Sequence, residues 1–180
     1  MLGEVNVTGE KIQTDQTQEI KIKDIKMAPS ASGNTVEGII QQQAGVSTHS
    51  ELSSQYNVRG GAFDENSVYI NNVEVYRPFL VRSGQQEGLS VINPYMVDKI
   101  GFSTGGYGAK YGDKMSSALD ITYKTLKAKG KKPVVEGSAA ASLLGADAYV
   151  GLGTQKLSWL NSVRYKTTSY LLGTMETKGE

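Results

Sequence analysis

The sequence predicts an α+β domain followed by a set of long β-strands. Three observations predict it: a helical pattern near residue 36, a β-hairpin signal at 68–76, and polar–apolar alternation after residue 134. A chain of 180 residues is long enough for one compact domain with an appendage. Its 21 glycines suit the many turns that a β-rich fold requires.

Residues 1–28 are polar and contain only short alternations, such as Glu19-Ile20-Lys21-Ile22. A segment of this kind either adds an edge strand to a sheet or stays flexible, because it offers little apolar area to offset the entropy lost on ordering. The first four residues lack both the basic start and the apolar core of a secretory signal. The protein is then either cytosolic or a mature or cloned fragment whose Met1 was added, and the strands expected at the C-terminal end favour the fragment.

The clearest helix follows the turn-rich segment 29–33. Asn34 is a candidate N-cap, and Glu37 lies three residues later, as in a capping box. Gly45 is well placed to end the helix. The apolar residues that follow helical spacing are Val36, Ile39 and Ile40.

The domain's strands are predicted from alternation and turn residues. Residues 55–61 alternate and end at Arg59, which we expect on the buried side of the strand, before two glycines. Asn71-Asn72 predicts a type I′ hairpin turn, since asparagine tolerates the left-handed conformation. Asn93-Pro94 predicts a short helical turn, and residues 99–103 and 118–124 predict two further strands.

The rest of the chain predicts a linker and membrane strands. Residues 124–132 hold five lysines and no acid, which is typical of a solvated linker. Residues 134–152 and 157–166 then suit two transmembrane β-strands, joined by a tight turn near Gly153. Two strands cannot close a barrel, and an open sheet edge is not stable in lipid. We therefore expect the remainder of the barrel to lie outside this chain.

Composition excludes several classes of function. A net charge of +1 gives no general reason to expect a nucleic-acid partner. The chain has no cysteine and a single histidine, His49, so thiolate sites and histidine-based metal sites or triads cannot form within it. The glycine run 105–108 matches neither nucleotide-binding template. We predict no catalytic residue, metal or cofactor, and expect the acidic pair Asp64-Glu65 to be solvated.

The order of the motifs resembles the plug domain of TonB-dependent outer-membrane receptors. The motifs that carry the resemblance are Thr35-Val36-Glu37-Gly38-Ile39-Ile40, Gly45-Val46, Val58-Arg59-Gly60, Ile70-Asn71-Asn72-Val73-Glu74-Val75, Val97-Asp98-Lys99-Ile100 and Tyr111-Gly112 with the strand 118–124. Two segments depart from the family pattern, Ser103–Gly106 and the hairpin tip Asn71-Asn72. These departures indicate a sub-branch and make it unsafe to transfer a substrate.

The resemblance implies a small mixed-sheet plug with two short helices, followed by the first hairpin of a transmembrane β-barrel. The expected organisation is a TonB-binding segment and leash at 1–28, the plug at 29–126, a linker at 127–133 and barrel strands at 134–180. It also implies a receptor in the bacterial outer membrane, with its N-terminus in the periplasm. The expected function is energy-coupled uptake of a scarce nutrient such as a siderophore, cobalamin or a glycan, without enzymatic chemistry.

The resemblance also assigns roles to residues. The segment expected to add a β-strand to the C-terminal domain of TonB is Leu2, Gly3, Glu4, Val5, Asn6, Val7 and Thr8. Arg59 and Asp98 are expected to latch the plug to the barrel, although a surface or locally paired arginine is the simpler interpretation of Arg59. The residues expected to face an extracellular substrate are Gly61, Phe63, Asp64, Arg77, Phe79 and Arg82.

Two other classes remain open from the sequence. The first is a soluble periplasmic binding or adaptor module that shares the plug layout, in which case residues 134–180 would pack onto the domain. The second is a glycine-loop enzyme, which would need a pair of titratable residues in a cleft, and the sequence suggests no such pair.

Overall fold

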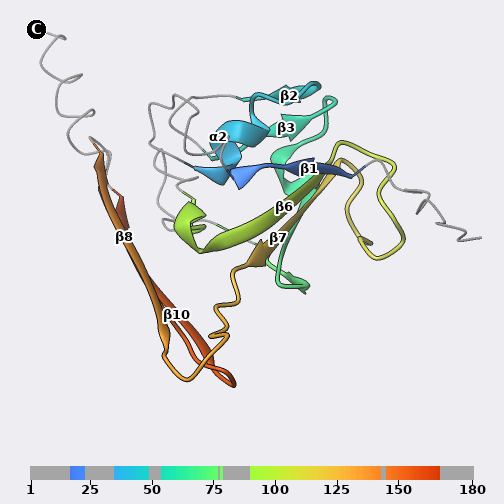
Figure 1. Cartoon of the computed structure of the whole chain (residues 1–180). Coiled ribbons are helices and arrows are strands. Elements are labelled where there is room, and N and C mark those ends of the chain that lie inside the picture. The colour runs from blue at the N-terminus through green and yellow to red at the C-terminus, as the bar shows by residue number, and fades with distance from the viewer. Residues whose placement is uncertain are drawn as a thin grey trace, which may run out of the picture.

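The computed structural model describes residues 17–22, 35–48, 54–76, 78, 90–142 and 145–166. Within them the chain forms a five-stranded sheet, a two-stranded sheet and a three-stranded sheet. Figure 1 shows the three-stranded sheet as a long ribbon that stands beside the other two sheets. The small mixed sheet with short helices confirms the predicted α+β class.

The five-stranded sheet has the order β1-β6-β7-β4-β5. Its strands are β1 (Gln18–Ile20), β4 (Asn66–Ile70), β5 (Val73–Glu74), β6 (Val97–Ser103) and β7 (Ser117–Tyr123). β4 runs parallel to β7, and the other pairs are antiparallel, which makes the sheet mixed. The polar N-terminal region thus supplies an edge strand, one of the two outcomes that its alternation allowed.

One face of this sheet carries the core. Ile100 pairs with Ile121 and Phe102 with Leu119 across β6 and β7, so four apolar side chains share that face. All four are buried, and Tyr56 meets Phe102 edge to face with ring centroids 6.1 Å apart. The opposite face is more polar. Here Tyr111 packs against Tyr69 and its hydroxyl donates to Asp120, which also pairs with Lys110 at 3.0 Å.

Helix α2 (Val36–Ile40) completes the core with Val36, Ile39 and Ile40. Its N-cap is Thr35, whose hydroxyl accepts a hydrogen bond from the Gly38 backbone at 3.1 Å. The capping box predicted from Asn34 is therefore wrong by one residue. Because the cap moves to Thr35, Glu37 is not at the position that would reach back to the cap, and its side chain is buried instead.

The hairpin between β4 and β5 confirms its turn residues. Asn71 and Asn72 have φ values of 50° and 66°, the left-handed pair that a type I′ turn needs. Asn71 is also fastened to β7, because its amide N–H donates to Ile121 O and its side-chain oxygen accepts from Tyr123 N, both at 2.8 Å. The hairpin tip consequently lies at the end of β7 from which the chain leaves the domain.

The strand predicted at 55–61 is shorter in the structure. It forms only β3 (Asn57–Val58), which pairs with β2 (Val46–Ser47) just after the helix. Arg59 already lies in the turn, with φ 51° and an exposed side chain, so the expectation of a buried-side arginine is wrong. The two short 3₁₀ helices are η1 (Phe63–Glu65) and η3 (Pro94–Met96), and Asn93 caps η3 as predicted.

The tail forms three strands rather than the predicted two. They are β8 (Val134–Ser142), β9 (Gly145–Gly153) and β10 (Ser158–Lys166), paired antiparallel in sequence order. The run 134–152, predicted to form one strand, instead forms the hairpin of β8 and β9, in which Ser142 pairs with Gly145 and Gly145 has a φ of 148°. Among the described residues, no helix has the length and apolar character needed to cross a membrane.

The two faces of the three-stranded sheet differ in polarity. The large apolar side chains exposed on one face are Val135, Val150, Leu152, Trp159, Val163 and Tyr165. The positions that alternate with them are more buried and include Glu136, Ser138, Asp147, Ser158, Ser162 and Arg164. The apolar face is thus turned away from the domain and the polar face toward it, the reverse of a sheet that packs an apolar face on a core.

The burial of Ile121 leads to a stability prediction. Ile121 is fully buried between β6, β4 and α2, so Ile121→Ala should lower the free energy of unfolding by about 2–5 kcal/mol. The neighbouring Thr122 is exposed on the same strand, and Thr122→Ala should cost less than about 1 kcal/mol. Chemical denaturation of the two variants measures the difference, and equal losses would contradict this assignment of the core face.

Candidate functional site

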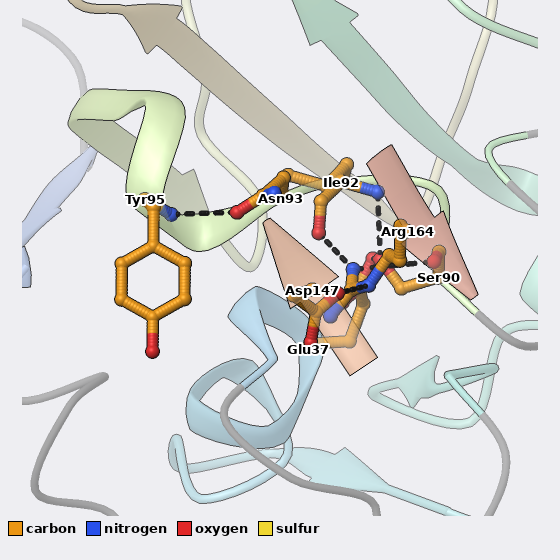
Figure 2. A network of polar contacts seen from close by, with 7 residues as sticks. All are labelled: Glu37, Ser90, Ile92, Asn93, Tyr95, Asp147 and Arg164. Atoms are coloured by element: carbon orange, nitrogen blue, oxygen red, sulfur yellow. Dashed lines mark hydrogen bonds and ion pairs between the residues drawn. The ribbon is translucent and has the colours of Figure 1, made fainter. Parts of the chain in front are cut away.

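A buried polar network lies where the domain meets the three-stranded sheet (Figure 2). On the domain side, Glu37 of α2 accepts a hydrogen bond from the Ser90 hydroxyl at 2.5 Å. Ser90 also accepts from the amide of Ile92 at 3.1 Å, which folds residues 90–92 into a tight turn beside the helix. Glu37 and Ser90 are each only 3% exposed, so this carboxylate is held inside the protein.

Arg164 of β10 supplies the other side of the network. Its guanidinium donates to the carbonyl of Ser90 at 3.2 Å and to the carbonyl of Ile92. Its Nε lies 2.7 Å from Oδ1 of Asp147, its direct cross-strand partner on β9. The side chains of Arg164 and Asp147 are 4% and 10% exposed, so the ion pair is almost dry. We call these five residues, Glu37, Ser90, Ile92, Asp147 and Arg164, the Arg164 network.

The network holds one guanidinium and two carboxyl groups. Burial raises the pKa of the Glu37 carboxyl, while the Ser90 hydroxyl and the charge of Arg164 act against that rise. Burial also raises the pKa of the Tyr123 hydroxyl, and the nearby Glu37 carboxylate adds to the effect. Glu37 Oε2 and Arg164 Nη2 are both buried without a hydrogen-bond partner among the described residues, and Arg164 Nε meets Asp147 Oδ1 as an ion pair without hydrogen-bond geometry. The network therefore contains a buried carboxyl group, that of Glu37, which is easier to protonate than an exposed one.

The linker makes a second contact with the three-stranded sheet. The amide of Leu126 donates to Ser158 Oγ at 3.0 Å, and the amide of Ala128 donates to Thr154 O at 3.3 Å. Gly151 and Gly153 leave the space that Leu126 occupies: a Cβ on Gly153 would lie 2.6 Å from Leu126 O. The linker is therefore seated on the polar face, although its lysines 127, 129, 131 and 132 are exposed as predicted.

The loops at the other end of the domain lie where β4 and β7 begin. Residues 59–65 pack against Ser116 of the glycine-rich loop, whose hydroxyl donates to Val58 O at 2.8 Å. Gly61 is required at this contact, because a Cβ there would lie 2.5 Å from Ser116 Oγ. Phe63 and Asp64 are exposed at the loop surface. Arg77, Phe79 and Arg82, also expected at a substrate surface, lie outside the described residues.

The structure does not bring the two predicted latch residues together. Arg59 lies near Gly105, just past the C-terminal end of β6, whereas Asp98 is the second residue of that strand. Both are exposed, and no ion pair joins them in the part of the chain that the structure describes. The predicted TonB-binding segment 2–8 lies outside the described residues. Across those residues no group of three acidic, histidine or cysteine side chains could hold a metal.

Sequence reasoning missed all three charged members of the Arg164 network. Arg164 and Asp147 carry a signal in retrospect, since each is a charge on the polar face of an alternating strand. Glu37 carries no such signal, because an acid in the first turn of a helix is ordinarily explained by capping.

The raised pKa of Glu37 makes a pH prediction. A folded-state pKa above the unfolded value means that the protonated form stabilises the fold and that this stabilisation is lost as pH rises. The free energy of unfolding of the wild type should therefore fall, relative to Glu37→Gln, as pH rises from the ordinary value of 4.5 through the raised pKa. Denaturation at a series of pH values measures it, and parallel curves for the two proteins would contradict the assignment.

The contact between the linker and the three-stranded sheet leads to a labelling prediction. Gly153→Val should push Leu126 off the sheet, because the atoms it would strike belong to the backbone and cannot rotate away. Ala128, 8% exposed, reports the change: in the Ala128→Cys background, which carries the chain's only thiol, maleimide labelling should speed up several-fold. Gly130→Val is the control, since a Cβ at Gly130 meets nothing within 4 Å. Unchanged labelling in the Gly153 variant would show that the linker is not seated there.

Comparison with solved structures supports the same architecture. A crystal structure of a ferric enterobactin receptor variant from Pseudomonas aeruginosa matches 82% of this chain with a TM-score of 0.52 and 19% sequence identity. Another variant of that receptor, in complex with enterobactin, also matches 82% of the chain, with a TM-score of 0.50 and 21% identity. This chain spans about a quarter of the receptor's length, 24% in each case.

The family comparison covers most of the domain. No curated protein matches the sequence. The family model described as the TonB-dependent receptor plug domain matches residues 10–118, which include α2 and the strands of the five-stranded sheet as far as the start of β7. The fold of the two receptor structures and this match agree with the motif order seen in the sequence. The chain belongs to the TonB-dependent receptor plug domain family.

Proposed function

We propose that this chain is the gate and the first wall strands of an outer-membrane transporter that takes up a scarce nutrient with energy delivered by TonB. The single observation that carries the proposal is the reversed polarity of the three-stranded sheet. Its exposed face presents valine, leucine, tryptophan and tyrosine side chains, and its other face presents charged and polar groups to the plug. That division suits a barrel wall between lipid and a filled lumen.

The strand lengths support a wall that crosses the membrane. β8, β9 and β10 have nine residues each, within the ~9–11 that a tilted transmembrane strand needs. A wall of three strands leaves two open edges, which lipid does not tolerate. Further strands of the same protein would close the barrel around the plug.

The direction of the plug follows from its connections. The linker leaves β7 beside the hairpin tip and enters β8, so this end of the plug lies at the rim where the wall begins. Loops 59–65 and 104–116 lie at the opposite end of β4 and β7. We assign the linker end to the periplasm and the loop end, with Gly61, Phe63 and Asp64, to the external substrate.

The gate would work by reversible binding and conformational change, without bond making. TonB would engage residues 2–8 through strand addition and pull, and the plug would rearrange to open a path. The crystal structures that share the fold are of ferric enterobactin receptors. A ferric siderophore is accordingly the first substrate class to test, ahead of cobalamin and glycans.

A soluble periplasmic adaptor is not favoured. In such a module the apolar residues of 134–166 would be buried against the domain, yet Val163 and Tyr165 are 67% and 66% exposed. The contacts that do reach the domain include polar ones made by Arg164 and Glu136. Apolar side chains of this size facing outward would make a soluble protein prone to association.

Deletion of residues 2–8 from the intact receptor tests the function. Uptake of a labelled ferric siderophore by cells should fall to the level of cells without TonB, because the strand that TonB binds is gone. The thermal unfolding midpoint of the purified receptor should not change, since the plug core starts later in the chain. A receptor whose uptake is the same with and without TonB would refute the proposal.

A further inference from the structure

We propose that Arg164, aligned by Asp147, is the clamp that keeps the plug seated against the wall, and that its release opens the path for substrate. This inference rests on the proposed function, because it assigns the closed state of that gate to particular residues. It differs from the latch expected at Arg59 and Asp98. The charged side chain, Arg164, comes from the wall, and it binds mainly backbone carbonyls of the plug.

Arg164 binds backbone carbonyls of the plug, which has a consequence for substitutions there. Arg164 donates to the carbonyls of Ser90 and Ile92, two acceptors that no side-chain substitution in the plug removes. Nη1 of Arg164 donates to both carbonyls while Nε faces the Asp147 carboxylate, an arrangement that the planar fork of guanidinium donors permits. A lysine in its place has one nitrogen at the end of a flexible stem and lacks the separate Nε that faces Asp147. Side-chain substitutions that remove these contacts must therefore be made in the three-stranded sheet, at Arg164 or Asp147.

Asp147 acts as the positioning residue of the clamp. It lies directly across from Arg164 in the β9–β10 ladder, so the pair is set by strand register and not by loop conformation. The 2.7 Å contact to Nε leaves Nη1 directed at the carbonyls of Ser90 and Ile92, as Figure 2 shows. The pair itself belongs entirely to the wall. Movement of the plug can break the carbonyl contacts while the buried arginine keeps its counter-ion.

Glu37 connects the clamp to the part of the plug nearest the N-terminus. It is bonded to Ser90, whose carbonyl Arg164 holds, and it lies in α2, the first described element after β1. A pull on the N-terminal segment would reach β1, then α2, and through Glu37 the clamped turn. The linker contact lies elsewhere, at Leu126 and Ala128, and tethers the C-terminal end of the plug. The Arg164 network is thus on the path along which the pull is transmitted, and the linker contact is not.

The test uses the intact receptor in cells that lack TonB, with entry of a hydrophilic antibiotic too large for general porins as the readout. Arg164→Ala should raise antibiotic entry at least tenfold over the wild type. Arg164→Lys should leave most of that leak in place. Arg59→Ala is the matched control, an exposed arginine outside the network, and should leave entry at the wild-type level. Wild-type entry in Arg164→Ala would overturn the proposal.

Hydrogen exchange distinguishes a clamp from a general support of the fold. In Arg164→Ala, backbone amides of residues 35–40 and 90–93 should exchange at least tenfold faster, while those of β6 and β7 stay as in the wild type. Faster exchange throughout β6 and β7 would overturn the proposal, because it would mean that Arg164 only stabilises the plug core.

A second variant covers the case in which Arg164→Ala does not fold. Asp147→Asn keeps the guanidinium but weakens its alignment, and should give a smaller leak of several-fold; no change would overturn the role of Asp147. All these measurements are made without TonB. Failure of the clamp would therefore leave TonB-dependent uptake by the wild type intact, and loss of that dependence would count against the proposed function alone.

Discussion

The polarity of the three-stranded sheet constrains the rest of the structure. A strand that shows apolar side chains to one side must show the alternating residues to the other, and here those residues include Glu136, Asp147 and Arg164. Charged groups that leave water are stable only when they are paired and hydrogen-bonded. The plug meets this demand with Lys124 for Glu136 and with backbone carbonyls for Arg164. The surface of the plug domain that faces the three-stranded sheet thus supplies partners for charges on that sheet.

The two attachments of the plug, the linker contact and the Arg164 network, are stabilised by different kinds of interaction. The linker is held by close packing. Gly151 and Gly153 have no side chain, and Leu126 can therefore approach the sheet. The Arg164 network is held by charge and directed hydrogen bonds in a nearly dry seam, where loss of one partner costs about 3–5 kcal/mol. Contacts of the first kind change little when the plug shifts slightly. Contacts of the second kind are lost over a short distance, which is the behaviour a gate requires.

Local signals were strong enough to predict the elements but not their partners. The φ values of Asn71 and Asn72 and the cap at Asn93 follow from the chemistry of those residues, so sequence reasoning found them. The hairpin of β8 and β9 was missed because both strands continue the same alternation and Gly145, with a φ of 148°, follows a run of small and apolar residues. The resemblance to plug domains placed the latch at Arg59, but the residues that meet in the seam are brought together only by the fold. Glu37 and Arg164 are 127 positions apart in the sequence, and no local pattern relates them.

The contrast between Arg59 and Arg164 shows how context decides the role of one side-chain type. Arg59 follows a two-residue strand, adopts a positive φ and points its stem past glycines into solvent, so within this chain its charge is screened. Arg164 sits within a nine-residue strand, opposite an acid fixed by register, with its side chain 4% exposed. Water weakens the electrostatic energy of an exposed group, whereas a buried, aligned group retains it. Strand register and burial, more than the presence of an arginine, therefore determine which arginine of this chain can hold the plug.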